Sequence, residues 1–128
     1  MQMLIKNLLK VRYTILASII TFAITYLSLV KLDKQQISIA HLDKIEHTIA
    51  YFFLAITWLL AIKKAARNTK TKYIIVFCCI FFGIIIEVLQ TTLTNYREAS
   101  LLDALANSLG ALIAMLVFTI KFEKKRAI

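Results

Sequence analysis

Four long apolar stretches, separated by short polar segments, alternate along this chain. A helix needs about 20 predominantly apolar residues to cross the hydrocarbon core of a bilayer. The last three stretches reach that length only if they include polar residues near one end. The pattern predicts an all-α integral membrane protein in which residues 1–128 form a single membrane domain. Its four transmembrane helices are expected at about 13–30, 44–62, 73–92 and 101–120.

Composition supports a membrane class. Hydrophobic residues make up 60% of the 128 residues, whereas soluble domains contain about 45 to 50%. A secretory signal peptide is the alternative for the first stretch, because Lys6, Lys10 and Arg12 precede it. Signal peptides have a shorter apolar region and an A-x-A-like cleavage site, which the LSLVKLDKQ segment after this stretch lacks. We therefore expect an uncleaved anchor.

The charges predict the orientation. A net charge of +9 could indicate nucleic-acid binding, but the basic residues cluster between apolar stretches, which favours a membrane interface and no nucleic-acid partner. Loops rich in Lys and Arg stay in the cytoplasm. Both termini are therefore expected in the cytoplasm. Twelve basic residues lie on the side of the termini: Lys6, Lys10, Arg12, Lys63, Lys64, Arg67, Lys70, Lys72, Lys121, Lys124, Lys125 and Arg126. The other side has four: Lys31, Lys34, Lys44 and Arg97.

Polar residues inside the last three stretches recur at helical spacing. A charged side chain at the bilayer centre costs roughly 2.5 to 3.5 kcal/mol on insertion scales, so such residues face the protein interior. The spacing places each set on one helix face. We expect the three faces to meet near the outer leaflet and form a polar pocket that opens outward. The sets are Asp43, His47 and Tyr51; Gly83, Glu87 and Gln90; and Asp103, Asn107 and Gly110.

These sets also resemble a known family. The patterns are Asp43-Lys44-x-x-His47-x-x-x-Tyr51, Gly83-x-x-x-Glu87-x-x-Gln90, and Arg97 followed by Asp103-x-x-x-Asn107-x-x-Gly110. They are similar to the signature of the VanZ-like family, small multi-pass bacterial membrane proteins named for a member associated with teicoplanin resistance. The resemblance implies a location in the bacterial cytoplasmic (inner) membrane, a cell-envelope context and a link to antibiotic resistance. It does not indicate a particular biochemical activity.

Several of these residues have structural interpretations as well. Asp103 and Ser100 fit a capping box at a helix start, and Gly110 with Ala106 and Ala114 forms a ridge of small residues typical of helix packing. Asn107 and Gln90 suit hydrogen bonds between helices. A buried ion pair with Lys44 or Arg97 would explain the carboxylate of Glu87 within an apolar stretch. Arg97 itself could bind an anion through its guanidinium group, or it could simply lie at the membrane interface. The adjacent Cys78 and Cys79 are expected to pack without bridging.

The leading functional hypothesis is a binding protein for an anionic or polar headgroup, such as that of a lipid-linked cell-wall precursor, in contact with membrane lipids. One alternative is a membrane-embedded enzyme with His47 and Glu87 as candidate acid/base groups, and another is a structural subunit of an envelope complex. No metal ligand set or cofactor is predicted, because no compact metal-binding spacing exists. The oligomeric state is left open. The candidate ligand-binding residues are Asp43, Lys44, His47, Tyr51, Glu87, Gln90, Arg97, Asp103 and Asn107.

Overall fold

The computed structural model describes residues 1–30, 40–66, 68–93 and 100–123, and these residues are almost entirely helical. Side chains are described throughout these ranges except at residues 6, 40–43, 64–65 and 123. The helices are α1 (Gln2–Leu29), α2 (Ala40–Ala61), the short α3 (Lys63–Ala66), α4 (Thr69–Leu93) and α5 (Leu101–Phe118), followed by a π-helical segment, η1 (Thr119–Glu123).

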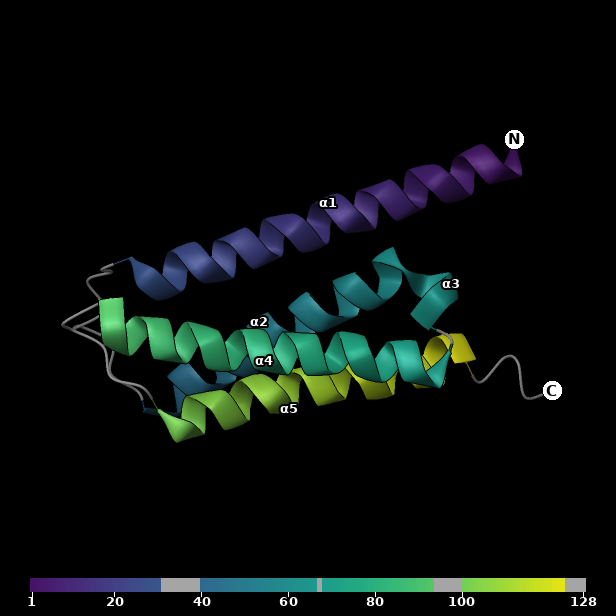
Figure 1. Ribbon diagram of the computed structural model, residues 1–128. Helices are drawn as coiled ribbons and strands as arrows, with labels where there is room; N and C mark the ends of the chain where they lie inside the picture. The colour runs from purple at the N-terminus through teal and green to yellow at the C-terminus, as the bar shows by residue number, and fades with distance from the viewer. Residues whose placement is uncertain (31–39, 67, 94–99, 124–128) are drawn as a thin grey trace.

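Four of these helices are long and apolar enough to cross a membrane: α1, α2, α4 and the stretch that α5 and η1 form together (Figure 1). This confirms the predicted all-helical fold with four candidate spans. Helix α1 begins at Gln2, well before the predicted start near Tyr13. No glycine or proline interrupts this segment, and lysine and arginine are good helix formers, so the basic residues extend the helix instead of ending it.

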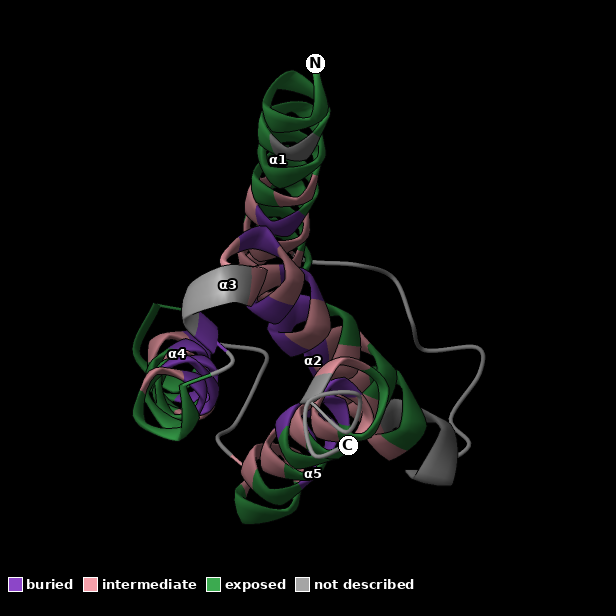
Figure 2. Ribbon diagram, turned by 90° about the vertical axis from the view of Figure 1, so that its right-hand side faces the viewer, coloured by how far each residue is buried: buried purple, intermediate pink, exposed green. Residues whose placement is uncertain are grey.

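Helix α2 lies at the centre of the bundle. In the end-on view it lies between α1 and α5, with α4 to one side (Figure 2). Its buried residues include Tyr51, Leu54 and Leu59, which pack with buried side chains of α4 and α5 such as Val76 and Phe118. The outer faces of the helices are apolar, as a lipid environment requires. On α5 the exposed leucines are Leu101, Leu102, Leu105, Leu109, Leu112 and Leu116.

Small residues bring α2 and α5 close together. Ala106, Gly110 and Ala114 are all buried on one face of α5. A Cβ atom added at Gly110 would lie 2.1 Å from the carbonyl oxygen of Thr48, so only glycine fits between the two backbones. The packing interpretation of this ridge is confirmed.

Hydroxyl groups within the helices bond to their own backbone. The Thr21 hydroxyl donates to the Ala17 carbonyl at 2.8 Å, Thr57 to Phe53 at 2.6 Å and Ser108 to Ala104 at 2.9 Å. Each bond joins residues four apart, the usual way a hydroxyl is satisfied in a helix that has no water around it. The protons of these hydroxyls therefore need no acceptor on another helix.

Helix α1 lies at the edge of the bundle and is mostly exposed, although Ala17 is fully buried. Among the described residues, hydrogen bonds from α2 and α4 connect it to the rest of the bundle. The Trp58 indole N–H donates to the Thr21 hydroxyl at 3.1 Å, and the Gln90 amide donates to the Ser28 carbonyl at 2.9 Å. Gln90 thus joins two helices by a hydrogen bond, as one interpretation of the sequence predicted.

The start of α1, α3 and η1 all lie at one end of the bundle (Figure 1). Basic residues gather at this end. The Lys72 ammonium group is buried and donates to the Thr119 hydroxyl at 2.9 Å, and Lys63 lies 4.3 Å above the ring of Phe122. The polar residues that the sequence analysis singled out lie toward the opposite end.

Candidate functional site

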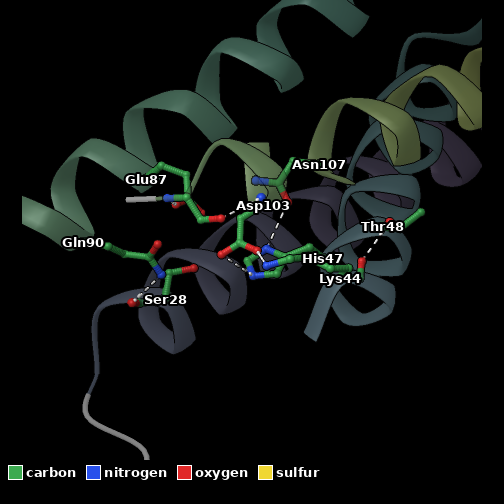
Figure 3. A network of polar contacts seen from close by, with 9 residues as sticks. Ser28, Lys44, His47, Thr48, Glu87, Gln90, Asp103 and Asn107 are labelled. Atoms are coloured by element: carbon green, nitrogen blue, oxygen red, sulfur yellow. Dashed lines mark hydrogen bonds and ion pairs between the residues drawn. The ribbon is translucent and has the colours of Figure 1, made fainter. Parts of the chain in front are cut away.

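Polar side chains from three helices meet near the end of the bundle opposite α3 (Figure 3). They come from the start of α2, the last third of α4 and the start of α5. We call the group formed by Lys44, His47, Glu87, Asp103 and Asn107 the polar cluster. The three segments lie on different helices, so the packing of the helices creates this group.

Asp103 links two members of the polar cluster. Its Oδ1 atom accepts a hydrogen bond from the ammonium group of Lys44, and its Oδ2 atom lies 3.7 Å from Nε2 of His47. The side chains of Lys44, His47 and Asp103 are 33%, 19% and 14% exposed. This side of the polar cluster is therefore accessible from the end of the bundle.

Asn107 orients the imidazole of His47. The Oδ1 atom of Asn107 lies 3.0 Å from Nδ1 of His47. An amide oxygen can only accept a hydrogen bond, so this geometry makes Nδ1 the donor. In the neutral imidazole the lone pair is then on Nε2 and directed toward Asp103. Asn107 is almost fully buried, which fixes the position of the ring.

The start of α5 connects two helices through Ser100. The hydroxyl of Ser100 accepts from the backbone N–H of Asp103 at 3.3 Å, which confirms the predicted cap. In a complete capping box the Asp103 side chain would accept from the backbone N–H of Ser100. Here that N–H donates instead to Oε2 of Glu87, at 3.1 Å. A residue of α4 thus completes the cap of α5, and the Asp103 carboxylate is left to contact Lys44 and His47.

Removing the cap hydroxyl should weaken the start of α5. We expect Ser100→Ala to lower the free energy of unfolding by about 1 kcal/mol, the usual cost of losing an N-cap oxygen. Chemical unfolding in mixed micelles would measure this change. Ser108→Ala is the matched control, since its hydroxyl bonds only to its own helix. Equal stabilities of the two variants would contradict the proposed role of Ser100.

Three buried polar atoms in the described part of the chain have no hydrogen-bond partner: the Tyr51 hydroxyl, Oε1 of Glu87 and Nδ2 of Asn107. They lie on three different helices. Gly83 packs against two of these residues, Tyr51 and Asn107. A Cβ atom added at Gly83 would lie 3.1 Å from the Tyr51 ring and 3.2 Å from Nδ2 of Asn107. Buried polar groups in proteins nearly always have partners, so these three atoms are unusual among the described residues.

Other candidate residues lie elsewhere. Gln90 bonds to α1 and is not part of the polar cluster. Lys44, one of the two ion-pair partners considered for Glu87, forms an ion pair with Asp103. Arg97 and the side chain of Asp43 lie outside the described residues. The sequence analysis missed the contribution of Ser28, because only a backbone carbonyl is involved and no side-chain pattern could indicate it.

A metal ligand set was not predicted, because the candidate donors lie on separate helices. The structure brings donor atoms of His47, Glu87 and Asp103 within 4.8 Å of one another. This proximity depends on how the helices pack and has no counterpart in local spacing.

A cavity of about 280 Å³ lies among α1, α2 and α4. Its lining is mainly apolar and includes Thr21 of α1, Leu54 and Trp58 of α2, and Phe82 of α4. The ring of Phe82 also packs against Tyr51, with 6.2 Å between ring centroids. The cavity is lined by Cys78 and Cys79 as well. Neither cysteine is bridged, and Cys79 packs in the core whereas Cys78 is exposed.

Comparison with known proteins supports the resemblance. The sequence profile of the VanZ/LLP1 family matches residues 3–122, nearly the whole chain. A protein of Schizosaccharomyces pombe, described as uncharacterized, is 34% identical over 86 residues, which cover 66% of this chain and 50% of that protein. The match thus spans about half the length of this relative. No solved structure matches the chain significantly.

Proposed function

We propose that this chain, which belongs to the VanZ/LLP1 family, is a membrane protein whose polar cluster binds the headgroup of a lipid. The observation that carries the proposal is the set of unpaired buried atoms on Tyr51, Glu87 and Asn107. A buried polar group without a hydrogen bond costs roughly 1 to 3 kcal/mol. A bound headgroup would remove that cost.

The chemistry of these atoms favours a ligand with both donors and acceptors. Nδ2 of Asn107 donates, Oε1 of an ionised Glu87 accepts, and the Tyr51 hydroxyl can do either. A headgroup with hydroxyl and phosphate oxygens offers partners for all three. Because Lys44, His47 and Asp103 are partly exposed, the ligand would enter past them and reach the buried atoms behind.

The cavity beside α1 supports a lipid as the ligand. Its lining includes Leu54 and Phe82. The ring of Phe82 packs against the ring of Tyr51, and Leu54 follows Tyr51 on α2. A ligand with its headgroup at the polar cluster would place an acyl or isoprenoid chain alongside this mainly apolar lining. The arrangement suits an amphipathic molecule in the membrane.

The orientation in our proposal places both termini in the cytoplasm. The basic residues at the end of the bundle that contains α3 and η1 support this orientation through the positive-inside rule. The polar cluster would then face the outer leaflet of a bacterial cytoplasmic membrane. A lipid-linked cell-wall precursor is the ligand class that fits this location, and it would connect the protein to the cell envelope and to glycopeptide resistance.

Tyr51→Phe provides a sharp test, because it removes only a hydroxyl that has no hydrogen-bond partner among the described residues. The purified chain in phosphatidylcholine nanodiscs should bind polyprenyl phosphate saturably, and native mass spectrometry can measure the affinity. We expect Tyr51→Phe to weaken binding roughly two- to tenfold, the value of one hydrogen bond, while the unliganded variant is at least as stable as the unchanged protein.

Tyr26→Phe is the matched control, since Tyr26 is 65% exposed on α1. Polyprenol and inorganic phosphate serve as comparison ligands. Polyprenol has the isoprenoid chain without the phosphate, and inorganic phosphate lacks the isoprenoid chain. Equal affinity of the unchanged protein and Tyr51→Phe for polyprenyl phosphate would contradict the proposal. Conversion of the lipid to a product that His47→Ala abolishes would instead identify an enzyme.

A further inference from the structure

We propose that His47, Glu87 and Asp103 form a binding site for a divalent metal ion. Their donor atoms lie within 4.8 Å of one another, and they come from α2, α4 and α5. One imidazole and two carboxylates form a mixed nitrogen and oxygen ligand set that divalent transition-metal ions accept. The inference concerns the protein alone and does not depend on lipid binding.

The direction of the hydrogen bond to Asn107 is the first argument. Because Nδ1 of His47 donates to Oδ1 of Asn107 at 3.0 Å, the neutral ring presents the lone pair of Nε2. That atom lies 3.7 Å from Oδ2 of Asp103, which is also an acceptor. A cation between these two atoms would be bound by both of them. Metal-binding histidines typically donate their other ring N–H to a protein oxygen in this way.

The unpaired atom of Glu87 is the second and independent argument. Glu87 is only 4% exposed, its Oε2 atom accepts from the backbone N–H of Ser100, and its Oε1 atom has no partner. A buried carboxylate oxygen without a hydrogen bond is costly. A metal ion beside His47 and Asp103 would bind this oxygen directly.

The distances fit with a small adjustment. Zinc lies about 2.0 to 2.2 Å from nitrogen and oxygen ligands, so two ligand atoms of one ion are roughly 3 to 4 Å apart. Donor atoms already within 4.8 Å need only small side-chain rotations to reach that separation. Water or a ligand oxygen would fill the remaining coordination positions, as in sites with three protein ligands.

The charges of the polar cluster give the ion a role. The Lys44 ammonium group is already paired with Asp103, and Glu87 adds a carboxylate, so a neutral His47 leaves these four side chains with an excess of negative charge. A divalent ion would reverse the sign. It would thereby make the same end of the bundle attractive to a phosphate group.

Mn²⁺ is the best probe, because it prefers oxygen ligands. Thiolates prefer softer ions, so Cys78 and Cys79 should contribute little to the measured Mn²⁺ binding. The full chain, without a histidine tag, would be titrated with Mn²⁺ in detergent. The concentration of free Mn²⁺ would be measured by electron paramagnetic resonance. We expect saturable binding of about one ion per chain. Glu87→Gln, His47→Gln and Asp103→Asn should each weaken it by at least about tenfold.

Two further variants make the test specific. Glu46→Gln removes an exposed carboxylate next to His47 in sequence and should leave the affinity unchanged. Asn107→Ala keeps all three ligands but frees the ring, and it should weaken binding roughly 10- to 100-fold, as loss of an orienting partner does. Glu87→Gln retains an oxygen for the Ser100 N–H, and thermal unfolding without metal would verify that each variant is folded.

Absence of saturable Mn²⁺ binding would overturn the proposal, as would equal affinities for the unchanged protein and folded Glu87→Gln. A protein that binds Mn²⁺ but no polyprenyl phosphate would keep this inference and refute the proposed headgroup site, so the two failures can be told apart.

Discussion

Gly110→Ala is expected to destabilise the protein more than any other single methyl addition. The added Cβ atom would lie 2.1 Å from the Thr48 carbonyl oxygen and 2.9 Å from the Phe52 backbone nitrogen. Both neighbours are backbone atoms of α2, so no side-chain rotation can relieve the clash, and α2 and α5 must separate. Alanine favours a helix by about 1 kcal/mol over glycine, but overpacking costs about 1 to 3 kcal/mol or more. We expect a net loss of about 2 kcal/mol.

Gly83→Ala is the matched control for this prediction. A Cβ atom there would meet the Tyr51 ring at 3.1 Å and the Asn107 side chain at 3.2 and 3.3 Å. These side chains can shift by a few tenths of an ångström, so the unfolding free energy should change by less than about 1 kcal/mol. Unfolding in mixed micelles would compare the two variants. Equal stabilities would show that α2 and α5 are not held as close as described.

Asp103→Asn is expected to have the second largest effect on stability. It keeps the backbone N–H that Ser100 caps but leaves the Lys44 ammonium group without its charged partner. Breaking a buried ion pair costs about 3 to 5 kcal/mol. Because the Lys44 side chain is 33% exposed, solvent would offset part of this cost, and we expect a loss of about 1 to 3 kcal/mol.

A double-mutant cycle can isolate the pair from the other roles of Asp103. Lys44→Met removes the charge while keeping an apolar side chain, and the combination of Lys44→Met with Asp103→Asn should lose less stability than the sum of the two single variants. Additive effects of the pair would contradict a direct interaction between Lys44 and Asp103.

The helices and the small-residue contact could be predicted from the sequence because their signals are local. Long apolar stretches without proline indicate helices, and Ala106, Gly110 and Ala114 occur at a spacing that defines one helix face. The same periodicity predicted which faces Glu87 and Asn107 occupy. Their meeting in one cluster followed from the cost of exposing polar groups to lipid, which leaves the protein interior as the only place for them.

The pairing within the polar cluster could not be predicted, because it depends on the relative rotation and height of three helices. The sequence alone does not distinguish Glu87 from Asp103 as the ion-pair partner of Lys44. The packing of α2 against α5 selects Asp103. The cap of α5 is a second example. A Ser-x-x-Asp pattern predicts that Asp103 completes the box, whereas the tertiary contact gives this role to Glu87.

The bond from the Ser100 backbone to Glu87 restricts which residues evolution can accept at position 87. One oxygen of this side chain holds the start of the next helix, and the other is left for the proposed ligands. Glutamine at position 87 would keep the hydrogen bond from the Ser100 backbone N–H but not the second carboxylate oxygen. Aspartate has a shorter side chain, so its carboxylate would lie farther from Ser100. A mutational survey scored only by protein abundance would therefore record Glu87→Gln as silent, although the substitution would remove a carboxylate oxygen that the proposed metal and headgroup sites use.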